Sequence, residues 1–296
     1  MKFQGIMPAL ITPLNADESI NTAVLADLLE GLLAKGVDGF YVAGATGEGL
    51  ALRPAERRVL AEETIRIVAH RKPCIIQVAS TDFSEAVALA KHAEAIGAEA
   101  ISATAPIFFK YDENDVYNYY KALADAVHIP LMMYYSPMAN FPMDAKFAAR
   151  CFEIDNVTAI KWTSPNYYQM MELKNMTHGE MNIINGPDEM LLMGLNAGAD
   201  GGIGSTYNVM PEMYLRVFNS FRAGDIATAT ATQRKVASIV TELIRHPVIP
   251  SVKAVLEEMG YAVGQATFPM KRLTETERAD LIAAVKAAGL SLEKFA

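Results

Sequence analysis

Eight short apolar runs alternate with amphipathic segments between Gly5 and Phe221, and this alternation constrains the fold more than any other feature. Each run is continuously apolar, whereas a strand with one face in water alternates apolar and polar residues. Continuous runs are typical of parallel strands that are buried on both faces. The runs are 5–12, 37–43, 74–79, 98–103, 129–135, 157–162, 181–185 and 199–204. Eight strand–helix units in series predict an α/β fold, a (β/α)8 TIM barrel.

Local signals support the helices between these runs. Four leucines between Leu25 and Leu32 recur at helical spacing, with Asn21 as the expected N-cap and Gly36 just past the helix end. Asp82, followed three residues later by Glu85, predicts a capping box at the third helix. A glycine, a small residue and an acid recur at 36–38, 97–99 and 198–200, which is a weak internal repeat.

After Gly224 the pattern becomes purely helical. Helices are expected at 226–245, 251–259 and 274–288, so we expect residues 1–224 to form the barrel and 225–296 a C-terminal three-helix extension packed on it. A doubly wound open sheet is the alternative fold. It would need a nucleotide fingerprint after the first strand, and the sequence has none.

Composition and charge limit the function classes. A net charge of -8 argues against nucleic acid or an anionic membrane as a partner, but it leaves a small anionic substrate possible. No apolar stretch approaches the ~18 residues that a membrane span needs. The only two cysteines, Cys74 and Cys151, are too few for a disulfide framework, so we expect reduced thiols and a cytoplasmic protein.

Lys161 lies near the end of the apolar run 157–162, where an ammonium is costly unless it is paired or neutralised. Desolvation lowers the pKa of a lysine, and a neutral amine can form a Schiff base with a carbonyl substrate. The alternative is a lysine that emerges into solvent where the strand ends. Active sites of these barrels lie at the carboxyl ends of the strands, which favours the catalytic interpretation.

Other strand ends carry polar groups as well. The turn 44–49 (Gly-Ala-Thr-Gly-Glu-Gly) can offer backbone N–H groups to a carboxylate, with Thr46 adding a hydroxyl, or it is an ordinary turn in which Glu48 favours the next helix. Tyr134 can move protons or simply pack. Asp188 and Glu189 can accept hydrogen bonds from sugar hydroxyls, or favour a helix N-terminus.

Metal and serine-hydrolase chemistry lack motifs. The five histidines show no ligand spacing, neither cysteine has a partner at ligand spacing, and no Gly-x-Ser-x-Gly elbow occurs. We therefore expect no metal site.

In this order, the motifs resemble the N-acetylneuraminate lyase/dihydrodipicolinate synthase family along nearly the whole chain. Residues 44–48 resemble its carboxylate loop, Tyr134-x-x-Pro137 its catalytic tyrosine motif, and Lys161 its Schiff-base lysine. The resemblance implies a TIM barrel, a class I aldolase that uses pyruvate and needs no metal or cofactor, and a homotetramer. Lys161 would form the imine, Tyr134 with Thr46 would move the proton, and the backbone of Ala45 and Thr46 would hold the carboxylate.

The resemblance is closer to the lyase branch. The synthase branch carries an arginine where this chain has Ala139. The lyase branch matches this chain at the expected substrate-binding positions Thr163, Gly186, Asp188, Glu189 and Ser205. Two departures, Ala45 and Phe108, replace family residues that carry hydroxyls.

The resemblance thus implies cleavage of a 2-oxo sugar acid, N-acetylneuraminate, to pyruvate and N-acetylmannosamine. An aldolase for a 2-keto-3-deoxy sugar acid such as 2-keto-3-deoxygluconate is the main alternative. A dihydrodipicolinate synthase and a non-catalytic sugar-acid binding protein are the others.

Overall fold

The computed structural model describes residues 2–136 and 141–295 and contains a closed barrel of eight parallel strands. The strands lie in the order β1-β8-β7-β6-β5-β4-β3-β2. A parallel bridge between Ala9 and Tyr41 closes the ring between β1 and β2. The strands are β1 (Gly5–Pro8), β2 (Phe40–Val42), β3 (Cys74–Gln77), β4 (Ala100–Thr104), β5 (Leu131–Tyr135), β6 (Val157–Trp162), β7 (Asn182–Asn185) and β8 (Gly201–Gly204).

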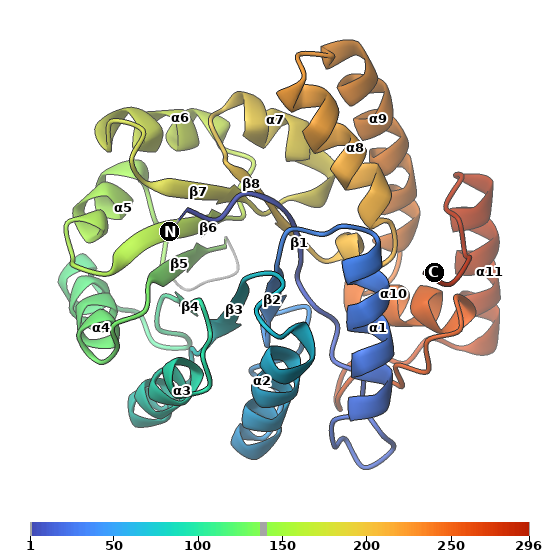
Figure 1. Cartoon of the computed structure of the whole chain (residues 1–296), viewed down its shortest axis with the longest axis horizontal. Helices are drawn as coiled ribbons and strands as arrows, with labels where there is room; N and C mark the ends of the chain where they lie inside the picture. Colours follow the sequence, from blue (N-terminus) through green and yellow to red (C-terminus); the bar gives the residue numbers. More distant parts are fainter. Residues whose placement is uncertain (1, 137–140, 296) are drawn as a thin grey trace.

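Each strand is followed by a helix, and the helices surround the barrel (Figure 1). They are α1 (Thr22–Ala34), α2 (Pro54–Val68), α3 (Phe83–Ala95), α4 (Glu113–Asp125), α5 (Ala145–Phe152), α6 (Tyr167–Met176), α7 (Leu191–Asn196) and α8 (Pro211–Arg222). Two short 3-10 turns, η1 (Asp188–Met190) and η2 (Thr206–Asn208), precede α7 and α8. The predicted TIM barrel is confirmed, and every predicted apolar run overlaps a strand.

The helix signals are mostly confirmed. Asn21 caps α1 by accepting a hydrogen bond from the N–H of Val24, and Gly36 has a φ of 82° just past its end. The capping box predicted at α3 is wrong in part. Asp82 caps the helix, but Glu85 forms an ion pair with Arg58 of α2 instead of returning to the cap. A charged partner on the neighbouring helix competes for that carboxylate.

Two apolar cores hold the barrel together. Ten buried residues, including Met7, Tyr41 and Ile203, fill the space inside the strands. A larger cluster lies between the strands and the surrounding helices and continues into the C-terminal helices. Because side chains alternate along a strand, the inward positions of β6 are Ala159 and Lys161.

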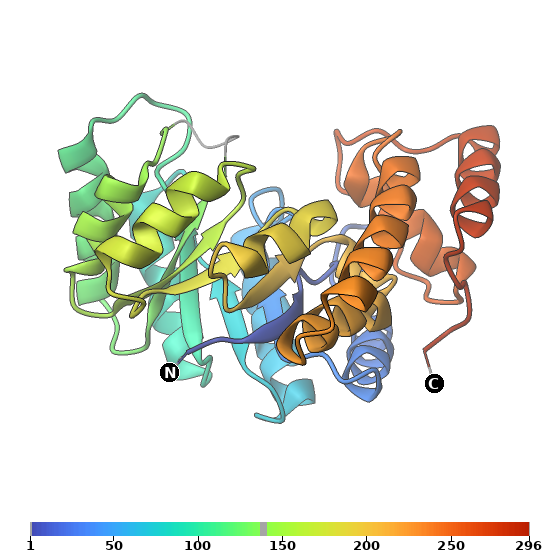
Figure 2. The ribbon, with the colours of Figure 1, turned by 90° about the horizontal axis from the view of Figure 1, so that it is seen from above.

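The helices α9 (Ile226–Leu243), α10 (Val248–Glu258) and α11 (Glu275–Ala287) follow the barrel and lie to one side of it, drawn from orange to red in Figures 1 and 2. Helix α9 packs along α8, and α10 contacts η2 near the end of β8. The C-terminal helical extension is therefore present, while the boundary at residues 224 and 225 stays a prediction.

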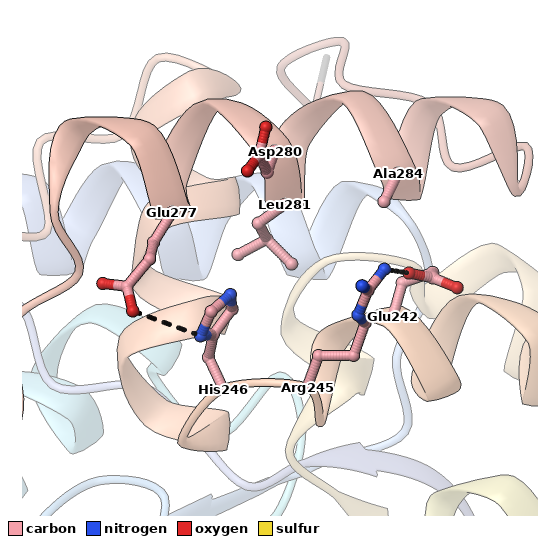
Figure 3. A pocket seen from close by; sticks show the side chains of 7 residues that line it. All are labelled: Glu242, Arg245, His246, Glu277, Asp280, Leu281 and Ala284. Carbon is pink, nitrogen blue, oxygen red and sulfur yellow. Dashed lines mark hydrogen bonds and ion pairs between the residues drawn. The ribbon is translucent and has the colours of Figure 1, made fainter.

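A cavity of about 280 Å³ separates the end of α9 from α11 within this extension (Figure 3). His246 Nδ1 lies 3.9 Å from Glu277 Oε1 across it. Hydrogen bonds from Lys271 and from the N–H of Thr274 lower the pKa of Glu277 to about 2, so it is ionised at neutral pH. These polar contacts stabilise the start of α11.

Among the described helices, none combines the length and the hydropathy of a membrane-spanning segment. Within the same residues, no group of three or more His, Cys, Asp or Glu side chains is arranged to hold a metal ion.

Candidate active site

Lys161 is the central residue of the site and is buried, with 6% of its surface exposed. Its Nζ lies 4.5 Å from the ring centroid of Tyr134 and 4.6 Å from that of Tyr41. Both distances are within the range of a cation–π contact. In the described part of the chain, no carboxylate lies within ion-pairing distance of this amine. Because the side chain is buried, the structure excludes the alternative of a solvent-exposed lysine.

The sheet register brings Tyr134 to Lys161. The two residues are Cα partners on β5 and β6, and Tyr134 is also the partner of Thr104 on β4. Tyr134 is buried beside the amine, so the predicted lysine and tyrosine lie together. The motif proline Pro137 and the branch-marking Ala139 lie outside the described residues.

Tyr41 completes the surroundings of the amine, although no motif marks it in the sequence. Its ring meets that of Tyr134 edge to face, with centroids 6.2 Å apart. Its hydroxyl shares a 2.9 Å hydrogen bond with Ser102 Oγ, and burial raises the pKa of Tyr41 well above its usual value. Tyr41 is therefore a neutral phenol inside the barrel. In the sequence, the only signal for Tyr41 was the alternation of side chains along β2, which directs its side chain into the barrel.

The predicted carboxylate loop, residues 44–49, follows β2. Ala45 is exposed and Thr46 is buried. The loop is held at its base by Thr12, whose hydroxyl donates to the carbonyl of Gly47 at 2.6 Å. Among residues 2–136 and 141–295, no acceptor lies on the backbone N–H of Ala45 or of Thr46. Two successive free N–H groups are the feature that a bound carboxylate needs.

Thr46 links this loop to the end of β8. Its Oγ1 lies 2.7 Å from Ser205 Oγ, and either hydroxyl can be the donor. The predicted Thr46 and Ser205 thus meet, although 159 residues separate them. The carboxylate loop and one wall of the expected sugar site therefore adjoin.

Asp188 is buried at the end of β7. Its Oδ2 accepts hydrogen bonds of 2.7 Å from both the N–H and the hydroxyl of Thr206, and this hydroxyl in turn contacts Tyr214. Burial raises the pKa of Asp188 to about 6, against the opposing hydrogen bonds from Thr206. The Thr206–Tyr214 support is not visible in the sequence, because Thr206 is one of several small polar residues after β8.

Glycines make room for the polar groups around Asp188. A Cβ at Gly204 would lie 2.1 Å from Asp188 Oδ1, and one at Gly186 would lie 1.9 Å from Thr163 Oγ1. The hydroxyl of Thr163 is buried without a hydrogen-bond partner among the described residues. An unpaired buried hydroxyl is costly in free energy.

Glu189 differs from its neighbour. It is exposed, and its backbone carbonyl accepts a 3.0 Å hydrogen bond from Gln233 of α9. Its charge contributes to the raised pKa of Asp188, so the two acids are close, but they do not form one buried pair. Phe108 lies on the β4–α4 loop with a φ of 81° and is 78% exposed.

Other reactive side chains are not prepared for chemistry. Cys74 and Cys151 are free and buried, and burial raises the pKa of the Cys151 thiol to about 12. Such thiols are mostly unreactive at neutral pH.

Comparisons with known proteins identify the family of the chain and agree with its fold. The model of the dihydrodipicolinate synthetase family matches residues 2–288. An N-acetylneuraminate lyase of Clostridium perfringens (strain ATCC 13124) is 31% identical over 274 residues, covering 92% of this chain and 95% of that protein. The structure of Proteus mirabilis N-acetylneuraminate lyase matches with a TM-score of 0.93 at 31% identity. The match covers 98% of this chain and 100% of that one.

A third relative is a prophage protein of the dihydrodipicolinic acid synthase family from E. coli K12, solved in complex with pyruvate. Its TM-score is 0.93 at 25% identity, with 98% of this chain and 99% of that one covered. A family model that spans almost the whole sequence and relatives aligned over nearly their full length fix the assignment. The chain belongs to the dihydrodipicolinate synthetase family and is a carbon–carbon lyase of that family, which includes the N-acetylneuraminate lyases.

Proposed function

We propose that this chain is a class I aldolase that cleaves N-acetylneuraminate to pyruvate and N-acetylmannosamine through an imine on Lys161. The observation that carries the proposal is the buried amine of Lys161 between the rings of Tyr41 and Tyr134, with no carboxylate paired to it in the described part of the chain. The names of the relatives support the substrate, and the pyruvate complex of the E. coli protein supports the product.

Imine formation begins with attack of the neutral amine of Lys161 on the C2 ketone. The resulting carbinolamine takes up a proton from solvent and loses water, which gives a protonated imine with its positive charge at the former amine nitrogen. The faces of the two tyrosine rings stabilise that charge without a counter-ion, because the quadrupole of an aromatic ring attracts cations. No metal or cofactor is needed, since the imine itself withdraws electrons.

The substrate carboxylate would bind to the free N–H groups of Ala45 and Thr46. Backbone donors suit this role because they are fixed in place before the substrate arrives. The missing hydroxyl at Ala45 leaves the two amides unchanged, so the loop can still hold a carboxylate. Thr46 adds its side chain next to Ser205.

Bond cleavage then requires removal of the proton from the C4 hydroxyl. Tyr134, with Thr46 and the substrate carboxylate, would take this proton as the C4 carbonyl forms. The electron pair of the C3–C4 bond passes to the imine nitrogen and gives an enamine. Protonation at C3 and hydrolysis of the imine release pyruvate and restore Lys161.

The aldehyde part of the substrate carries the hydroxyl groups. By family resemblance, Asp188 and Thr163 would bind them, with Ser205 and the exposed Glu189 at the edge and Gly186 beside Thr163. Unmatched buried polar groups discriminate strongly against substrates that lack the corresponding hydroxyls.

A 2-keto-3-deoxy sugar acid is the second candidate substrate. Two departures count against sialic acid and so favour this candidate: Ala45 stands where the lyases have Ser or Thr, and Phe108 stands where many family members have a tyrosine. We further propose that the enzyme is a homotetramer, by family resemblance, and that it is cytoplasmic, because its two cysteines are free thiols.

The substrate is tested by a turnover panel. We expect kcat/KM for N-acetylneuraminate to exceed that for 2-keto-3-deoxygluconate at least about tenfold, as hydroxyl recognition allows. A reversed order would reject the lyase assignment and keep the aldolase mechanism. Efficient condensation of pyruvate with aspartate semialdehyde would show that the argument from Ala139 is wrong, and no pyruvate from any compound would reject the proposal.

The role of Tyr134 is tested by Tyr134→Phe. We expect kcat to fall by ~10²–10⁴-fold, the usual contribution of a general acid–base group, with a much smaller change in KM. Steady-state kinetics would be measured together with a thermal melt. Because phenylalanine keeps the ring that packs beside Lys161, the melting temperature should stay close to that of the wild type. A variant within a few-fold of the wild type would make Tyr134 a packing residue only.

Asp188→Asn tests the sugar site. Loss of a charged hydrogen bond costs about 1.5–3 kcal/mol, so we expect KM for N-acetylneuraminate to rise ~10–100-fold while labelling by pyruvate with borohydride is unchanged. The wild-type KM should rise as the pH falls through about 6, where Asp188 becomes protonated, and the KM of the variant should not.

Stability provides the control. The pKa of Asp188 is raised in the folded state from its usual 3.8, so its contribution to stability is full at low pH and is lost as the pH rises through about 6. At pH 7.5 the variant should therefore melt no lower than the wild type. A lower melting temperature at pH 7.5 would mean that Asp188 is structural, and an unchanged KM would remove it from the sugar site.

A further inference from the structure

One buried ion pair joins the carboxylate loop to the C-terminal extension. Glu48 Oε1 of the loop lies 2.7 Å from Lys253 Nζ of α10, and the two side chains are 0% and 3% exposed. They come from opposite ends of the chain. The sequence alternative, in which Glu48 favours the start of the next helix, is wrong, because α2 begins only at Pro54 and the carboxylate points to α10 instead.

Both partners make further contacts with the segment after α10. Lys253 Nζ donates to the carbonyl of Gln265 at 2.8 Å, and Glu48 Oε2 accepts from the N–H of Thr267 at 2.6 Å. Burial lowers the pKa of Lys253, and the charge of Glu48 opposes this shift. The loop, α10 and the segment at 265–267 are thus tied together at one point.

The loop backbone is shaped by this residue. Glu48 has a φ of 59°, a left-handed conformation that is uncommon for residues other than glycine. Its neighbour Gly49 packs so closely that a Cβ there would lie 1.8 Å from the carbonyl oxygen of Ala43. A strained residue of this kind persists only where the surrounding structure holds it. The ion pair to Lys253 and the hydrogen bond from Thr267 supply that support from outside the barrel.

The N–H groups of Ala45 and Thr46 lie only three and two residues, respectively, before Glu48 in the same turn. The carbonyl of Ala45 itself accepts the N–H of Glu48 at 3.0 Å, so a shift of Glu48 moves Ala45 directly. Buried ion pairs contribute little net stability, because desolvation offsets the attraction, and apolar pairs often replace them without loss. Orientation of the loop is a role that apolar contacts would not provide.

We propose that Glu48 and Lys253 are positioning residues through which the C-terminal extension sets the geometry of the carboxylate loop and hence the affinity for the 2-oxo acid. This inference rests on the proposed imine chemistry. It places the extension in the substrate-binding apparatus.

The test is labelling by pyruvate and borohydride, measured as a function of pyruvate concentration. For Lys253→Met, we expect the half-saturating pyruvate concentration to rise about tenfold, below the ~10²-fold cost of a 1 Å misplacement of a reacting group. The maximal labelling rate should stay within about threefold, because Lys161 and Tyr134 are untouched.

A double variant, Glu48→Gln with Lys253→Met, separates an effect on the orientation of the loop from an effect on the stability of the fold. It leaves no unpaired buried charge, so its melting temperature should recover toward the wild type. Its half-saturating pyruvate concentration should stay raised, because the link from α10 to the loop is still absent. If Lys253→Met does not fold, the double variant carries the same test.

Lys174→Met is the matched control. Lys174 forms a partly buried ion pair of 2.9 Å with Asp200, before the start of β8 and thus at the opposite end of the strands. This variant should have a lower melting temperature than the wild type, but its half-saturating pyruvate concentration for labelling should be unchanged. The inference would be overturned if the half-saturating pyruvate concentration stayed within twofold of the wild-type value in both Lys253→Met and the double variant. It would also be overturned if, in the double variant, this concentration returned to the wild-type value together with the melting temperature. Failure of the wild type to be labelled at all would overturn the proposed function as well.

Discussion

The amine of Lys161 is held inside a closed barrel by two aromatic faces rather than by a carboxylate, and the rest of the site depends on this contact. A carboxylate at bonding distance would favour the ammonium and oppose attack on a carbonyl. The rings of Tyr41 and Tyr134 instead accept a positive charge without neutralising it. The same surroundings therefore suit both the free lysine and the protonated imine of the proposed mechanism.

The barrel provides this contact because parallel strands present adjacent inward positions at one level. Tyr134 and Lys161 are partners on β5 and β6, and Tyr41 faces them from β2 across the interior. Each wall of the substrate site then comes from a different strand end. The proposed carboxylate loop follows β2 and the proposed sugar site follows β7 and β8, and the Thr46–Ser205 contact joins them. The C-terminal helix α10 adds Lys253, which forms the buried ion pair with Glu48 of the loop.

Local and periodic features of the site were predictable from the sequence. Continuous apolar runs gave the strands, and a lysine in such a run was unusual enough to identify the candidate nucleophile. Contacts between residues far apart in the sequence were not predictable. Glu48 and Lys253 pair over 205 positions (253 − 48), and nothing local marks either residue as a partner of the other. Tyr41 was missed because a tyrosine in a buried strand is ordinarily a packing residue, and Thr206 because its role depends on the position of Asp188.

The most direct test of this account is peptide mapping after reduction of the protein with borohydride in the presence of pyruvate. The structure contains a second buried lysine, Lys253, which lies in an ion pair and provides an internal comparison. If Lys161 forms the imine, a pyruvate-derived mass will be found on the peptide that contains Lys161 and none on the peptide that contains Lys253. A stable adduct on any other lysine, or full activity without an adduct, would contradict it.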